Sequence, residues 1–235
     1  MEIKDITDLK KYLSQDWLLD GKKEMDEKFK ELATILLEEV AIKKGDKLYF
    51  IKDIEFYFYY KDHKDIVTYP RNCKAGEWFF NPTGGGVDIA FESHVDMTVN
   101  SKHIRKPKLN DNAKFGGILL REIYPADGNT AEDGAVVKLD GPMKLLDELF
   151  NNFDALDTPT DFPILVYNNT QRGNAVLKGD GKRYNLLGSK KDEKEKVESI
   201  MYNYNNDKNF IEREGLVSSF HDFLDAKYHF VLSDK

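Results

Sequence analysis

The chain is poor in several kinds of residue, and each shortage narrows its class. It has one cysteine, Cys73, among 235 residues, which excludes an internal disulfide framework and a zinc site built on cysteines. No apolar run approaches the roughly 20 residues that a membrane-spanning helix needs. The first residues, "MEIKDITDLKKYL", are charged and lack the apolar stretch of a signal peptide. We therefore expect a cytoplasmic protein without a membrane partner, nucleoid-associated if it binds DNA.

Excess positive charge is also missing, since the formal net charge is -7. Proteins bind nucleic-acid backbones through lysine and arginine, so this balance argues against a large non-specific nucleic-acid surface. A local basic patch is still possible, because residues 101–114, "SKHIRKPKLNDNAK", hold five lysines or arginines. A solvated loop explains that segment equally well. With 40% hydrophobic and 33% charged residues the chain is expected to be globular.

The periodicity of the apolar residues predicts strands in the middle of the chain and helices on either side. An amphipathic helix is expected over residues 24–43, and another over 140–150, with Pro142 in its first turn and Met143, Leu146, Leu149 and Phe150 on its buried side. Strands are expected at 48–60, 78–80, 87–91 and 115–125, and farther on a hairpin around 179–181, a helix over 190–204 and a last strand near 226–233. This pattern is typical of an α+β fold.

The aromatic strand "LYFIKDIEFYFYY" carries a carboxylate in its middle. Side chains alternate between the two faces of a strand. One face is expected to be apolar and to hold Phe50, Ile54, Phe56 and Phe58, with Lys52 as an exception. The other face is expected to hold Tyr49, Ile51, Asp53, Glu55, Tyr57 and Tyr59. The second face indicates either a cleft wall around Glu55 or an ordinary solvated sheet face.

Two further motifs contain residues that could bind a phosphate or a metal ion. "TGGG" at residues 83–86 lacks the lysine and hydroxyl residue of a P-loop, so a turn or a close backbone approach is favoured over a phosphate site. "ESHVD" places Glu92, His94 and Asp96 at alternate positions, which is conceivable for a metal site. A polar strand edge is the favoured interpretation, and no metal or other cofactor is expected.

Taken in order, six short elements of the chain resemble the alkyladenine (3-methyladenine) DNA glycosylase family, as a divergent member. They are a strand with Glu-x-Tyr ("IEFY"), a histidine in the next loop (His63), "PRN" at 70–72, the turn and strand "KAGEWFF", the strand "ILLREIYP", and the helix "GPMKLLDEL". They span residues 48–150. The C-terminal third matches poorly.

The resemblance implies a fold and a chemistry. It implies an antiparallel, partly barrel-like sheet flanked by helices. It also implies a single domain, with N-terminal helices over 1–45, a sheet core over 46–150 and a C-terminal extension over 151–235. Glu55 would deprotonate a water that attacks the sugar C1′ of a flipped nucleotide. Tyr57 and His63 would line the base pocket, Arg121 would support it, and Arg71 and Asn81 would contribute to substrate binding. The expected partner is DNA with a damaged purine, bound by a monomer.

The chain departs from the family at the turn "NPTGGGVD". The family carries a stacking tyrosine there and then a tyrosine that wedges into the duplex, where this chain has Asn81 and a glycine. A glycine cannot hold a duplex open. Either another residue does so, or the substrate is not duplex DNA, or the chain is a glycosylase-like binding protein that has lost its activity.

Overall fold

The structure is a computed structural model, and it describes residues 5–14, 22–82, 85–99, 105–128, 139–151, 153, 155–156, 161–170, 172–204 and 208–233. The helices are α1 (Ile6–Ser14), α2 (Lys22–Thr34), a π-helical turn η2 (Ile35–Glu39), α3 (Pro142–Phe150), α4 (Glu193–Tyr204), α5 (Lys208–Arg213) and α6 (Leu216–Leu224). The strands are β1 (Val40–Lys44), β2 (Lys47–Tyr60), β3 (His63–Lys64), β4 (Trp78–Phe80), β5 (Val87–Ala90), β6 (Asp96–Val99), β7 (Arg105–Lys108), β8 (Phe115–Pro125), β9 (Leu139–Asp140), β10 (Ile164–Tyr167), β11 (Ala175–Leu177) and β12 (His229–Leu232). The predicted α+β class is confirmed.

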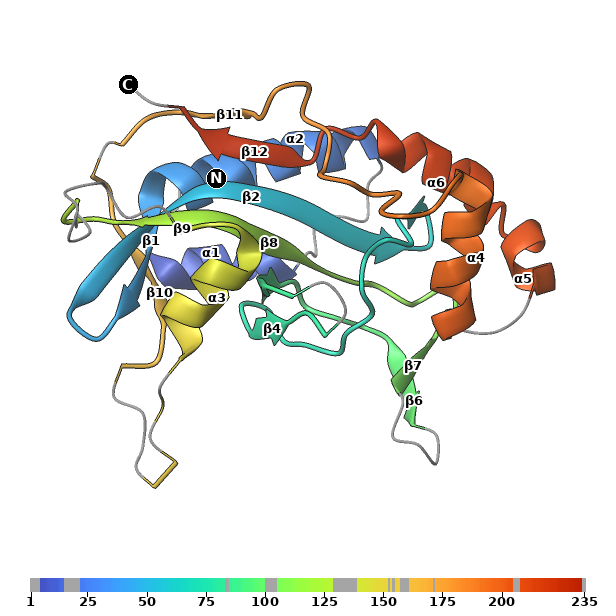
Figure 1. The fold of residues 1–235 in the computed structure, drawn as a ribbon, viewed down its shortest axis with the longest axis horizontal. Coiled ribbons are helices and arrows are strands. Elements are labelled where there is room, and N and C mark those ends of the chain that lie inside the picture. The colour runs from blue at the N-terminus through green and yellow to red at the C-terminus, as the bar shows by residue number, and fades with distance from the viewer. Residues whose placement is uncertain are drawn as a thin grey trace.

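One antiparallel sheet organises the molecule (Figure 1). Its main path runs β10–β1–β2–β8–β5–β4, and β12 joins it by pairing with β2. β1 pairs with the beginning of β2, and β12 pairs with the middle of the same edge, so two short strands share one side of β2. Strands from both ends of the chain therefore meet on β2, the longest strand at 14 residues.

The two faces of β2 are both covered. Ile54, Phe56 and Phe58 pack with α2 and η2 in the larger hydrophobic core. On the other face Tyr59 belongs to a second core, built with β8 and the helices α4, α5 and α6. Figure 1 shows these three helices grouped at the end of β2 that lies away from β1. The alternative of a solvated sheet face is therefore wrong here, because Glu55 itself is 0% exposed.

A β-bulge changes the predicted alternation in β2. The pairing with β8 skips Lys52 on β2 and Arg121 on β8. The extra residue shifts the phase of the strand, so Tyr49 and Ile51 lie in the larger core, contrary to the prediction. Phe50 instead packs against Tyr124 and the Arg172 guanidinium. Beyond the bulge the prediction holds, because Asp53, Glu55 and Tyr57 share one face.

The predicted helix over residues 24–43 ends early. It is helical only to Glu39, and Val40–Lys44 form β1. Gly45, with φ 57°, and Asp46 make the tight turn into β2. The apolar stripe continues without a break from α2 into β1 because both elements bury residues in the same core, so the pattern alone gives no sign of the change.

The glycine-rich turn lets α3 approach the sheet. It connects β4 and β5 as predicted, although residues 83–84 lie outside the described part. A Cβ on Gly85 would meet Met143, and one on Gly86 would meet Pro142 at 2.6 Å. The close-approach interpretation of "TGGG" is thus supported. In α3 the buried residues are Leu145 and Leu149, whereas Met143, predicted to be buried, is 57% exposed.

The C-terminal part adds strands to the sheet. The predicted hairpin around Gly179 is wrong, since β11 pairs with β12, about fifty positions later, rather than with the residues that follow the turn. The predicted helix over 190–204 and the predicted last strand are confirmed as α4 and β12. Among the described residues no helix combines the length and apolarity needed to cross a membrane.

Candidate functional site

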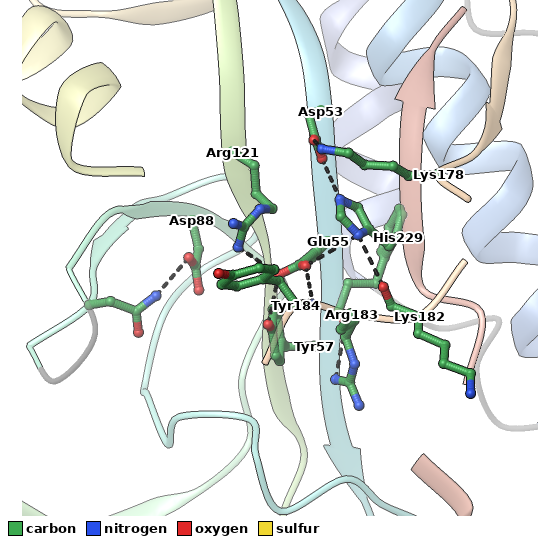
Figure 2. Close-up of polar contacts among 12 residues, drawn as sticks. Asp53, Glu55, Tyr57, Asp88, Arg121, Lys178, Lys182, Arg183, Tyr184 and His229 are labelled. Atoms are coloured by element: carbon green, nitrogen blue, oxygen red, sulfur yellow. Dashed lines mark hydrogen bonds and ion pairs between the residues drawn. The ribbon is translucent and has the colours of Figure 1, made fainter. Parts of the chain in front are cut away.

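Glu55 is the centre of a buried polar cluster on β2 (Figure 2). The Tyr57 hydroxyl donates to Glu55 Oε2 at 2.8 Å, and Arg121 Nη1 lies 3.3 Å from the same oxygen. The Tyr184 backbone N–H donates to Oε1 at 2.7 Å. Burial, followed by the negative charge of Glu55, raises the pKa of Tyr57 well above its ordinary value. Tyr57 therefore stays a neutral hydrogen-bond donor to the carboxylate.

The strand register explains why these residues meet. Glu55 lies opposite His229 on β12 and opposite Leu119 on β8, and Leu119 in turn lies opposite Asp88 on β5. Residues directly opposite each other in an antiparallel sheet point to the same face. Phe79 on β4 continues this row beyond Asp88. We call His229, Glu55, Leu119, Asp88 and Phe79 the cross-sheet row.

Arg121 reaches Glu55 from the bulge in β8. Because it is skipped in the pairing with β2, its side chain is not confined to the regular alternation of that strand. Its guanidinium also lies 5.0 Å from the centre of the Tyr184 ring. Tyr184 is 68% exposed. The cluster thus has a charged and aromatic lid, made by Arg121 and Tyr184, between Glu55 and solvent.

Arg71 and Asn81 gather at Asp88 rather than at Glu55. Arg71 Nη1 donates to Asp88 Oδ2, with both side chains 1% exposed, and Asn81 Nδ2 donates to Oδ1 at 2.8 Å. The Arg71 guanidinium stacks on Phe79 at 4.0 Å. Arg71 and Asn81, both predicted as site residues, therefore hold the buried carboxylate of Asp88 in the cross-sheet row.

Gly117 makes room for this pair. It lies between Tyr57 on β2 and Ala90 on β5, two residues along each strand from the cross-sheet row and on the same face. A Cβ at this position would stand 2.5 Å from Arg71 Nη1 and 3.0 Å from the Asp88 Cβ. The absent side chain is what admits the guanidinium to the sheet surface.

His63, expected beside Glu55, lies in a different environment. Its Nδ1 is 2.7 Å from the Phe58 carbonyl and its Nε2 is 2.9 Å from the Tyr228 hydroxyl. Its ring packs edge-on against Phe223. The structure therefore corrects the prediction that His63 closes the Glu55 pocket. His63 begins the short strand β3, which pairs back onto β2 and directs the ring into the aromatic core.

Several residues of the cluster were missed by sequence reasoning because they come from the C-terminal third. His229 Nε2 lies 2.7 Å from Asp53 Oδ1, and Lys178 Nζ donates to the other Asp53 oxygen. Arg183 forms a fully buried ion pair with Asp65. None of these residues stands in a local motif. His229 reaches the cluster through the pairing of β12 with β2, which is a long-range contact without a local sequence signal.

Burial opposes the charge on Asp53, but the hydrogen bonds from His229 and Lys178 outweigh it and hold the pKa of Asp53 below its ordinary value. At Asp88 the balance is reversed. Burial raises the pKa of Asp88 more than Arg71 and Asn81 lower it, and the charge of Glu55 adds to the increase. The pKa values of Asp53 and Asp88, the two carboxylates on either side of Glu55, are thus shifted in opposite directions.

Glu92, His94 and Asp96 do not form a ligand group. β6 begins only at Asp96, and His94 makes an isolated bridge to Lys114. Within the described ranges no three His, Cys, Asp or Glu residues are grouped so that they could hold a metal ion. A hollow of about 780 Å³ lies elsewhere, between α1, β4 and β10.

No protein-family model matches the chain, and no curated protein matches it.

Proposed function

We propose that this protein hydrolyses the N-glycosidic bond of an alkylated or otherwise damaged purine nucleotide, with Glu55 as the general base. The observation that carries the proposal is the contact between Arg121 and Glu55. The resemblance assigned both residues to one site although they are 66 positions apart. Their side chains meet on adjacent strands, and Tyr57, also assigned to the site, hydrogen-bonds the same oxygen.

The chemistry needs few parts. As the bond between C1′ and the base nitrogen breaks, its electron pair leaves with the base and the sugar gains positive charge. The Glu55 carboxylate stabilises that positive charge. It also accepts a proton from the water molecule whose oxygen forms the new bond to C1′. A purine that carries a positive charge from alkylation leaves as a neutral base, so its departure requires no added proton. Arg121 keeps the carboxylate in place while this happens.

Tyr184 gives the site an exposed aromatic surface beside Glu55. A flat base can stack on such a ring, and stacking of this kind contributes about 1–3 kcal/mol per base. The ring also lies over Arg121, so a stacked base would sit at the mouth of the cluster. Water and substrate reach Glu55 in this scheme only when the Tyr184 loop moves, because the carboxylate is 0% exposed.

That burial favours the second candidate, a glycosylase-like binding protein without turnover. Both oxygens of Glu55 are already bound by groups of the same chain. Asn81, which stands where the family carries a stacking residue, is held by Asp88. A site filled by its own side chains and backbone could retain a nucleic-acid surface and lack a reactive water.

Base release from a defined oligonucleotide separates the two candidates. The substrate carries one 7-methylguanine, a purine made cationic by alkylation, in duplex and single-stranded form. Wild type is expected to release the base, and Glu55→Gln to lose at least about 100-fold in rate, the usual contribution of a general base. Glu122→Gln is the matched control, because Glu122 lies on β8 opposite Asp53 and has no part in the proposed chemistry. No release by wild type from either form would favour the binding protein.

A further inference from the structure

His229 lies between the two carboxylates of β2 (Figure 2). It is nearly buried, at 5% exposed, and it stands opposite Glu55 in the strand pairing. Nε2 is 2.7 Å from Asp53 Oδ1. Nδ1 faces two oxygens, the Lys182 carbonyl at 3.1 Å and Glu55 Oε1 at 3.4 Å.

The neighbours of the ring determine how many protons it carries. A backbone carbonyl only accepts hydrogen bonds, and an ionised carboxylate likewise only accepts. Asp53 is ionised beside the Lys178 ammonium, which donates to its other oxygen. In a neutral imidazole one of the two ring nitrogens carries a lone pair in place of a proton. That lone pair would face a lone pair on the oxygen of Asp53 or of the Lys182 carbonyl. The arrangement therefore requires a proton on both nitrogens, so that His229 is an imidazolium.

The charges around the ring are balanced. Asp53 and Glu55 face it from β2, and Lys178 and Arg121 neutralise these carboxylates from the far side. From β8, Glu122 is close enough to Asp53 to feel its charge. The side chains of Lys182 and Arg183 are engaged elsewhere. Lys182 pairs with Asp225, and Arg183 pairs with Asp65.

We propose that His229 is the positioning residue of Glu55. As an imidazolium it holds Oε1 together with the Tyr184 N–H, which leaves Oε2 turned toward Tyr57 and Arg121. Asp53 and Lys178 hold His229 in turn, so a chain of charge-assisted contacts runs from the surface amine of Lys178 to the buried carboxylate. The inference rests on the proposed function only where activity is measured.

Nitrogen NMR of the imidazole rings tests the charge state without any substrate. With ¹⁵N-labelled histidine at neutral pH, both ring nitrogens of His229 are expected to carry protons, because each faces a hydrogen-bond acceptor. The signal is assigned with His229→Gln. Asp53→Asn is expected to shift the ring toward the neutral form, whereas His221→Gln, which removes an exposed histidine on α6, is expected to leave it unchanged. A neutral ring in wild type would overturn the inference.

Kinetics tests the effect on Glu55. A misplaced catalytic group can cost about 100-fold in rate, so His229→Gln is expected to lower kcat by about 10- to 100-fold. The KM is expected to stay near the wild-type value, because the ring does not touch the substrate. A wild-type kcat in His229→Gln would refute the positioning role.

The two proposals fail in different ways. If wild type releases no base, the carboxyl ¹³C signal of Glu55 replaces the rate as the readout. At neutral pH this signal is expected to differ between His229→Gln and wild type, because the ring no longer lies beside Oε1. That outcome would reject the hydrolase and retain the positioning role. An identical signal in the two proteins would reject the positioning role.

Discussion

Removing the charge of Arg183 is expected to cost far more stability than removing that of its neighbour Lys182. Both make an ion pair with an N–O distance of 2.5 Å, Arg183 with Asp65 and Lys182 with Asp225. Both side chains of the first pair are 0% exposed, whereas those of the second are 46% and 71% exposed. The two ion pairs thus have the same N–O distance and differ in how deeply they are buried.

The expected magnitude follows from what Arg183→Met leaves behind. Both oxygens of Asp65 lose their donor, and the Phe56 carbonyl loses one as well. Breaking one side of a buried pair typically costs about 3–5 kcal/mol because the remaining charge is uncompensated. For a chain of this size that corresponds to a fall in Tm of about 6–20 °C. Lys182→Met is expected to cause little measurable change, since solvent already screens its partner.

Urea unfolding followed by circular dichroism measures both variants against wild type. Adding Asp65→Asn to Arg183→Met is expected to restore part of the loss, because the stranded charge is then removed. Equal and small losses for Arg183→Met and Lys182→Met would refute the reasoning. So would a double variant that is as unstable as the sum of the two single variants.

Two further predictions concern the same face of the sheet. Gly117→Ala is expected to destabilise the fold by about 1–3 kcal/mol through overpacking against Arg71 and Asp88, and an unchanged Tm in thermal unfolding would contradict this. Asp53 has a lowered pKa, so the folded state binds its proton less readily than the unfolded state, and its contribution is complete above the unfolded value of about 3.9. The free energy of unfolding therefore decreases as pH falls through the folded pKa of Asp53. In urea titrations below about pH 4, this decrease is expected to be flatter in Asp53→Asn than in wild type. An equally steep decrease in the variant would exclude Asp53 as its source.

The sequence was sufficient where one physical signal dominated. Alternating apolar residues and flanking glycines identified β4, β5 and β8, and the proline and apolar spacing identified α3. The face shared by Asp53, Glu55 and Tyr57 was also predicted, because the strand is regular between the bulge and its end. The contact of Arg121 with Glu55 was expected only from the resemblance.

The failures have identifiable physical causes. The predicted helix extends wrongly over β1 because α2 and β1 bury one continuous apolar stripe. A single skipped residue at Lys52 reversed the first part of β2. His63 was assigned by its distance along the chain, whereas its direction depends on the pairing of β3. His229 and Tyr184 lie more than a hundred positions from Glu55, and long-range pairing leaves no local pattern.

The cross-sheet row has a consequence for how the protein is made. Its members come from β2, β4, β5, β8 and β12, so the row needs contacts between segments far apart in the sequence. Folds dominated by such contacts form slowly, because distant segments must be ordered before they gain from pairing. Synthesis runs from the N-terminus, so β2 leaves the ribosome long before His229 does. During that interval the part of the β2 edge that carries Asp53 and Glu55 lacks its pairing partner β12, and the two carboxylates lack the ring of His229.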